Sequence, residues 1–236
     1  MTLLVIIQDV CNAVGIEQPS SVIGNTEQNI TQLLQLANLE GKLLADSYDW
    51  QSLEVQGSIT TLAQEDQGAI DTLAPGFKKL IPDTMWDQDI IYPVQGSLSP
   101  QEYQQIKARS FTGPYPDFRI RGNRLLLFPI PAAGVDLKFE YISKNWVLAE
   151  DGTTTYARWT NDTDVGLLDE DIMTLGLRWR WLKAHNLDYA EEFRDYEVMK
   201  ANMQGRDAGK MKKNLAGRYN ASNLHKPIYK EGSWGQ

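Results

Sequence analysis

Helical periodicity in this chain comes in two blocks that are separated by about half of its length. Apolar residues recur at helical spacing before residue 50 and again between residues 166 and 205 of the 236-residue chain, but not from 51 to 165. An amphipathic helix must bury its apolar stripe against another element, and neither block has enough helices to do so alone. The pattern therefore predicts an α+β fold, in which a four-helix bundle is interrupted by an insertion between its second and third helices.

The first helical block predicts an antiparallel pair of helices. Residues 3–14 form the first helix, and Gly15 is suited to end it because glycine readily adopts left-handed backbone conformations. The second helix begins at Asn25 or Thr26, either of which is a favourable N-cap residue. Small residues within this second helix predict that a neighbouring helix approaches closely. The expected buried positions are Leu3, Ile6, Val10, Ala13 and Val14, then Ile30, Leu33, Leu34, Ala37, Gly41, Leu44 and Tyr48.

The second helical block predicts two further helices. Acidic residues at 169–171 open the third helix and basic residues follow near its end, which suits the helix dipole, and His185 is a candidate capping cation there. Asp188 is a candidate N-cap of the fourth helix, and the apolar period is lost from about Gly205. The expected buried positions are Ile172, Leu175, Gly176, Trp179 and Leu182, then Tyr189, Phe193, Tyr196, Met199 and Met203.

The middle block, residues 51–165, has the composition of short strands and turns, and it contains eight of the ten prolines. Gly122 and Asn123 lie between two strand-like runs and predict a tight hairpin over residues 119–128. Residues 135–141 alternate between apolar and polar, as a half-buried antiparallel strand does. Pro100 suits the first turn of a short helix that ends near residue 107. We therefore expect a β-rich insertion with a small sandwich or barrel architecture.

Charge is distributed unevenly along the chain. Residues 206–236 carry a net charge of +5, whereas residues 1–205 carry −13. An acidic body with a basic tail predicts a tail that docks on an acidic partner, and the polar, glycine-rich composition of the tail predicts a segment that is flexible until it is bound. The expected organisation is a first bundle segment at 1–50, the β-rich insertion at 51–165, a second bundle segment at 166–205, and a basic C-terminal arm at 206–236.

The sequence lacks the residue patterns of common catalytic sites. It has two histidines, and neither a nucleophile elbow nor a zinc-protease motif occurs. Residues 205–211 have the wrong spacing for a phosphate loop, and residues 162–167 lack the fifth and sixth positions of a calcium loop. We expect no enzyme activity and no catalytic, cofactor-binding or metal site, with a weak metal site among the acids near Asp164 left as an alternative.

Cysteine and aromatic residues narrow the remaining possibilities. Cys11 is the single cysteine, which excludes an internal disulfide, suits synthesis in a reducing cytoplasm and predicts a small core residue. No apolar run approaches the ~18 residues of a membrane span. The aromatic residues of the middle block either belong to a sheet core or form a sugar-binding platform, and they are Trp86, Tyr92, Trp146 and Trp159.

The order of these elements resembles that of tailed-phage head-to-tail adaptors, or connectors. Two helices, a β insertion entered through an aromatic stretch at 47–51, two more helices and a polar arm also follow one another in the tail tubular protein A family of short-tailed phages. Residues 118–131, 139–146 and 187–193 resemble stretches that are common in such proteins. The resemblance covers about residues 1–210.

The resemblance implies a structural virion protein at the neck, without catalytic residues. Such adaptors form a ring, usually of twelve copies, which connects the portal protein to a tail or nozzle protein and continues the DNA channel without sequence-specific binding. Another ring of the neck or tail, and a glycan-binding virion module, are the alternatives. The arm is the candidate portal-binding element, and its candidate contact residues are Lys210, Lys212, Lys213, Arg218, Tyr219, Leu224, Ile228 and Tyr229.

Overall fold

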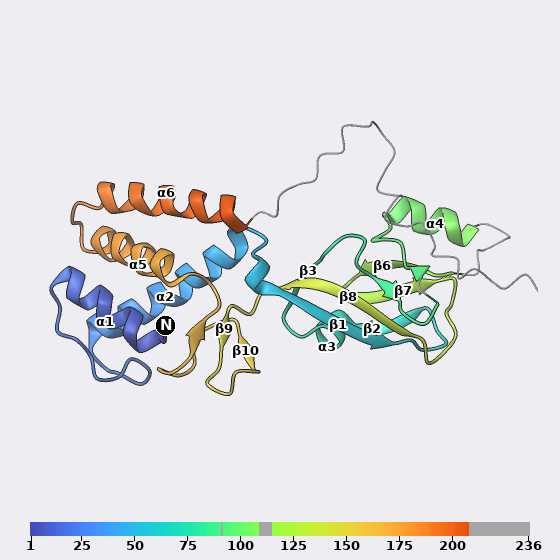
Figure 1. Cartoon of the computed structure of the whole chain (residues 1–236), viewed down its shortest axis with the longest axis horizontal. Coiled ribbons are helices and arrows are strands. Elements are labelled where there is room, and N and C mark those ends of the chain that lie inside the picture. Colours follow the sequence, from blue (N-terminus) through green and yellow to red (C-terminus); the bar gives the residue numbers. More distant parts are fainter. Residues whose placement is uncertain (91, 109–114, 208–236) are drawn as a thin grey trace, which may run out of the picture.

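The fold, given by a computed structural model, is α+β. The structure describes residues 1–90, 92–108 and 115–207. Figure 1 shows two lobes, one that holds the long helices and one that holds most of the strands. We call the first the helical body, which comprises residues 1–50 and 144–207, and the second the β lobe, which comprises residues 54–143. The two are joined by a 3₁₀ turn at Gln51–Leu53 and by the chain that returns after residue 143.

Six α-helices occur among the described residues. Four belong to the helical body, namely α1 (Leu3–Val14), α2 (Gln28–Ser47), α5 (Glu170–Ala184) and α6 (Ala190–Asp207). Two short helices lie in the β lobe, namely α3 (Ile70–Leu73) and α4 (Pro100–Ala108).

Helix α5 is the centre of the helical body, because it packs against α1, α2 and α6. Helices α1 and α2 therefore pack more extensively against α5 than against each other. The small residue Gly41 has a different role from the one predicted. A Cβ atom there would lie 2.2 Å from the Trp146 ring, so the indole occupies the space that we assigned to a helix. The close approach of two helices occurs instead at Gly176, which lies against the Glu40 side chain.

The helix ends are partly as predicted. Gly15 ends α1 in the left-handed conformation with φ of 74°, and Asp169 caps α5 by accepting hydrogen bonds from two backbone amides. Helix α2 begins one or two residues later than expected, because Glu27 occupies its N-cap position and the Asn25 side chain accepts from the Glu27 amide instead. Helix α6 continues through Gly205 to Asp207, since a glycine in open space is tolerated within a helix at a modest cost.

The buried faces of the helices are broader than the predicted stripes. Ala13 is exposed at the end of α1, and Leu175 and Leu182 are only half-buried. Because α5 contacts three helices, residues on several sides of it are buried, namely Ile172, Met173, Gly176, Leu177, Trp179 and Trp181. In α6 only Tyr196 is fully buried, so this helix lies on the outside of the body.

The β lobe contains two antiparallel sheets. The larger sheet has the order β1-β8-β4-β5, with β3 also paired to β8, and the smaller has the order β2-β7-β6. The strands of the two sheets are β1 (Glu54–Thr60), β2 (Asp66–Ala69), β3 (Phe77–Leu80), β4 (Trp86–Asp87), β5 (Tyr92–Pro93), β6 (Asp117–Arg121), β7 (Arg124–Phe128) and β8 (Asp136–Ser143).

The predicted hairpin and alternating strand are confirmed. Strands β6 and β7 pair antiparallel around Gly122 and Asn123, which have φ values of 56° and 61°, as a two-residue turn of this kind requires. The inward residues of β8 join residues of β1, β6 and β7 in one core, so both sheets share it. Helix α4 begins at Pro100 as expected, with reciprocal hydrogen bonds between Ser99 and Glu102 at its start.

A third, small sheet packs against the helices rather than in the β lobe. It consists of β9 (Val147–Leu148), β10 (Thr155–Tyr156) and β11 (Val165–Gly166), in the order β10-β9-β11. Trp146 and Trp159 cross edge to face with ring centroids 5.2 Å apart, and both are buried in the core of the helical body. The helical core therefore includes residues from within the 51–165 block.

Candidate functional site

The predicted portal-binding residues all lie outside the described residues, because α6 is described only as far as Asp207. This holds for Lys210, Lys212, Lys213, Arg218, Tyr219, Leu224, Ile228 and Tyr229. The structure does show where the arm begins, and we describe this region as the candidate site.

The arm begins at the junction of the two lobes. The Gln51 amide donates a hydrogen bond of 3.0 Å to the Asp207 carboxylate, and the Gln51 side-chain amide donates one of 2.6 Å to the Asp207 carbonyl. Gln51 opens the 3₁₀ turn that connects α2 to β1. The last turn of α6 is therefore tied to the chain segment that leads into the β lobe.

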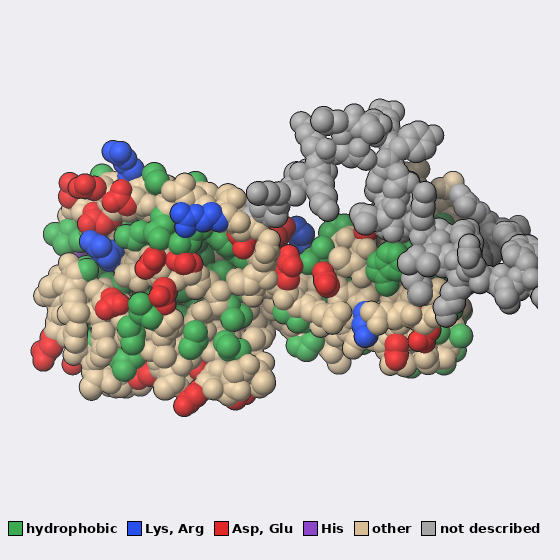
Figure 2. Space-filling model, viewed as in Figure 1, with side chains coloured by type: hydrophobic (Ala, Val, Ile, Leu, Met, Phe, Trp, Pro, Cys, Tyr) green, Lys and Arg blue, Asp and Glu red, His purple; other side chains and the backbone are tan. Residues whose placement is uncertain are grey.

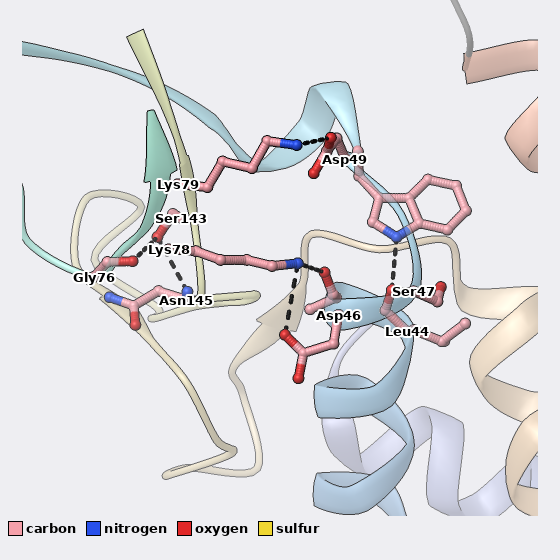
Figure 3. Close-up of polar contacts among 11 residues, drawn as sticks. Leu44, Asp46, Ser47, Asp49, Gly76, Lys78, Lys79, Ser143 and Asn145 are labelled. Carbon is pink, nitrogen blue, oxygen red and sulfur yellow. Dashed lines mark hydrogen bonds and ion pairs between the residues drawn. The ribbon is translucent and has the colours of Figure 1, made fainter. Parts of the chain in front are cut away.

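Two lysines of β3 extend across the junction to the end of α2 (Figure 3). The Lys78 ammonium donates to the Ala45 carbonyl and lies 3.5 Å from the Asp46 carboxylate, while Lys79 pairs with Asp49. The Lys78 side chain is 22% exposed, whereas that of Lys79 is 51% exposed. The Lys78 contacts are therefore better shielded from solvent, and of the two lysines Lys78 contributes more to holding the lobes in one orientation.

A second set of contacts fixes the chain where it returns from the β lobe. The Gly76 carbonyl accepts hydrogen bonds from the Lys144 amide and the Ser143 hydroxyl, and the Ser143 hydroxyl oxygen accepts from the Asn145 amide (Figure 3). Asn145 also donates to the Thr155 carbonyl in the small sheet of the helical body. Hydrogen bonds thus engage the chain at both crossings between the lobes.

An apolar groove lies beside the start of the arm. Its larger part has a volume of about 460 Å³ and is lined by residues that include Leu44, Trp50, Ile172, Met203 and Asp207. A neighbouring cleft of about 350 Å³ continues along α6 and shares Met203 and Arg206 with the first. The second cleft is lined by Leu175, Asp195, Val198, Met199, Asn202, Met203 and Arg206.

The helical body contains a buried ion pair that the sequence analysis missed. Arg180 of α5 donates to the Glu40 carboxylate, and the Glu40 side chain is fully buried. Burial raises the pKa of the nearby Tyr196 hydroxyl, and the negative charge of Glu40 raises it further. The sequence did contain a signal for this ion pair. Glu40 falls on the buried face of α2 between Ala37 and Leu44, where a charged residue requires a partner.

The acids around Asp164 organise loops. The Asp162 carboxylate accepts hydrogen bonds from the amides of Val22 and Ile23, at 3.1 and 2.7 Å. Burial disfavours the charged Asp164 carboxylate, but hydrogen bonds from Thr160 and Asn161 outweigh this effect and lower its pKa. Within the described ranges, no group of three or more His, Cys, Asp and Glu residues is placed to hold a metal ion.

The other candidate residues from the sequence are Cys11, His185 and the aromatic residues of the middle block. Cys11 is buried in the helical core, as predicted, and desolvation, together with the charge of Glu27, raises the pKa of its thiol. His185 follows the last residue of α5, and its ring lies 4.0 Å from the Trp181 ring. The four-residue sugar platform is not formed, because Trp146 and Trp159 are buried in the helical body rather than beside Trp86.

A comparison with protein-family models finds a match to the SU10 adaptor protein model over residues 1–225. The chain belongs to the SU10 adaptor family. No curated protein matches its sequence. The family match is consistent with the predicted class, a structural adaptor of a phage virion.

The surface of this SU10 adaptor is rich in acidic side chains (Figure 2). Acidic side chains are spread over the visible face of both lobes, among fewer Lys and Arg side chains (Figure 2). No helix in the described part of the chain is long and apolar enough to cross a membrane. This adaptor thus has an acidic body of two lobes. Where its basic arm begins, the end of α6 is hydrogen-bonded to Gln51, and the groove lies beside it.

Proposed function

We propose that this SU10 adaptor is a non-enzymatic connector that forms a ring, usually of twelve copies, between the portal and the tail of the virion. In this proposal it is made in the host cytoplasm and acts at the neck, much as the tail tubular protein A family does. The four long helices form the bundle that faces the portal, and the inserted β lobe faces the tail or nozzle protein. The family match and the two-lobed architecture support this role.

The observation that carries the proposal is the junction. The lobes have largely separate cores, yet Lys78 of the β lobe donates to the Ala45 carbonyl of α2. The Gly76 carbonyl of the β lobe accepts from the Lys144 amide, and Gln51 fixes the connecting 3₁₀ turn to the end of α6. A subunit that links two different rings needs two binding lobes with a fixed relative orientation. The end of α6 at the same junction places the root of the arm between the two lobes.

The charge distribution supports a channel that lets DNA pass. Duplex DNA carries one negative charge per ~1.7 Å, so acidic walls repel it and do not retain it. A body with a net charge of −13 suits this function, while the +5 arm is free to bind the portal. Because twelve arms dock on one preassembled ring, weak individual contacts gain ~10²–10⁴ in overall binding strength.

Binding to the portal ring of the same phage tests the proposal. We expect the double substitution Lys212→Glu with Lys213→Glu to weaken sedimentation with portal rings by about tenfold or more, because avidity multiplies a weakened contact. Arg121→Glu, at the exposed end of β6 in the lobe that is proposed to face the tail, is the control and should bind as the wild type does. Equal binding of all variants would contradict the role of the arm. Binding to another neck or tail ring instead would support the alternative position.

A further inference from the structure

The residues that line the groove beside α6 indicate which kind of segment could bind there. Its floor is formed by side chains that include Leu44, Ile172, Met199 and Met203. Methionine side chains are flexible and adapt to different apolar partners. The charged residues around the groove are predominantly acidic, namely Asp169, Asp195 and Asp207, with Arg206 as the basic exception. The groove therefore fits a segment that combines apolar anchors with positive charge.

We propose that residues 208–219 of the same chain dock in this groove when the protein is not bound to a portal. This inference goes beyond the adaptor role, since it concerns the free protein. The groove begins at Asp207, the residue after which this segment starts, so docking requires only that the chain reverse direction. Gly209 suits such a reversal because glycine adopts backbone conformations that other residues avoid.

The length of the segment matches the length of the groove. The groove extends along α6 from Asp207 back to Asp195, a distance of ~18 Å at 1.5 Å per helical residue. After a reversal at Gly209, residues 210–219 would span ~15 Å in helical form. A helical segment of this length would cover most of the groove.

The sequence of the segment matches the chemistry of the groove. Met211, Leu215 and Tyr219 are spaced by four residues, which places them on one face of a helix. The basic residues of the segment are complementary in charge to the acids on the groove, and they are Lys210, Lys212, Lys213 and Arg218. One face supplies apolar anchors, and the flanking positions supply the positive charge.

Docking would place the groove and the portal in competition for the same residues. The four basic residues and Tyr219 are also the proposed portal contacts in the first half of the arm. A free adaptor would then hold half of its arm against its own body, which reduces the fraction that is competent to bind. This competition would limit contacts between arms and other copies until a portal ring offers twelve adjacent sites.

Methyl NMR of the full-length monomer, with ¹³C-labelled methionine and no portal present, tests the proposal. The chain has six methionines, of which Met199 and Met203 line the groove and Met211 lies in the segment. We expect nuclear Overhauser contacts from the Met211 methyl to Met199 or Met203. Met85, which is buried in the β lobe, serves as the internal reference.

A pair of adjacent substitutions supplies the matched control. We expect Leu215→Asp to abolish the contacts of Met211 and to shift the Met199 and Met203 signals, whereas Asn214→Asp adds the same charge on another face and should preserve the contacts. Absence of these contacts in the wild-type protein would overturn the proposal. Contacts that fade on dilution would assign the groove to the arm of a second copy, which would also overturn it. Portal binding is measured separately, so failure here leaves the adaptor role untouched.

Discussion

The two lobes of this adaptor are stabilised in different ways. The core of the β lobe is apolar and follows the alternation of its strands, with Leu137, Phe139 and Tyr141 pointing inward from β8. Both lobes contain a glycine packed closely against an aromatic ring, Gly41 against Trp146 and Gly57 against Phe139. The helical body differs in that it also holds a fully buried carboxylate, Glu40, which pairs with Arg180. An apolar core tolerates volume-conserving changes, whereas a buried ion pair loses stability when one partner is removed.

Removal of Glu40 should have the largest effect. Glu40→Ala leaves Arg180, whose side chain is only 16% exposed, without its carboxylate partner, and we expect a loss of about 3 kcal/mol in the free energy of unfolding. Five of the seven tryptophans lie in the helical body, so tryptophan fluorescence during urea denaturation reports mainly on this lobe. Glu197→Ala, which breaks only the exposed contact with Lys200, is the control and should cost less than about 0.5 kcal/mol. Equal effects of the two substitutions would contradict the importance of the buried ion pair for the stability of the helical body.

Substitution of Gly41 should have the next largest effect. In Gly41→Ala the new methyl group overlaps the Trp146 ring, and we expect a loss of about 2–3 kcal/mol from overpacking. Gly205→Ala makes the same change in open space on α6 and should instead stabilise the protein by about 0.5–1 kcal/mol. Thermal unfolding of both variants separates the steric effect at Gly41 from the general gain of replacing a helical glycine.

A smaller effect is expected in the turn between β6 and β7. Asn123 has a positive φ of 61°, so Asn123→Ala should destabilise the β lobe by about 1 kcal/mol. Asn123→Gly retains access to this backbone conformation and should cost less, although both variants lose the hydrogen bond to Asp71. Hydrogen exchange of peptides from β6 and β7 measures the difference. If the alanine and glycine variants exchange equally fast, backbone strain is not the cause.

Two carboxyl groups, one in each lobe, should contribute to the pH dependence of stability with opposite signs. Hydrogen bonds lower the pKa of Asp164 in the helical body, so its charged form adds stability at neutral pH that is lost as pH falls below about 3.9, the ordinary aspartate value. Burial raises the pKa of Asp117 in the β lobe, so the destabilising contribution of its charged carboxylate should be relieved as pH falls through the raised pKa. Hydrogen exchange across the acid range measures each lobe, and Asp164→Asn and Asp117→Asn should flatten the respective profiles.

The sequence allowed more of the β lobe's local structure to be predicted than of the helical packing. A two-residue turn and a period of two are local patterns, so the hairpin at Gly122 and the alternation of β8 could be identified directly. Helical periodicity located the four long helices but not their partners. Because Gly41 meets a tryptophan more than one hundred residues later, no pattern within α2 could show whether a helix or a ring fills that space.

The candidate site was harder to predict than the fold. The predicted contacts are residues of the arm, whereas the structure shows the anchoring of the arm through Gln51 and Asp207, which are 156 residues apart. The contact of Lys78 with Ala45 uses a backbone carbonyl, which leaves no signal in the identity of residue 45. Polar contacts between distant segments depend on how the lobes are placed, and this placement is not encoded in any single motif.

Cryo-electron microscopy of the purified adaptor bound to the portal ring of the same phage tests the central claim most directly. The account predicts a ring of adaptor subunits below the portal, with the helical body against the portal, the β lobe directed away from it and the arm along the portal surface. A ring with the β lobe against the portal, or the absence of any ring on the portal, would contradict the account.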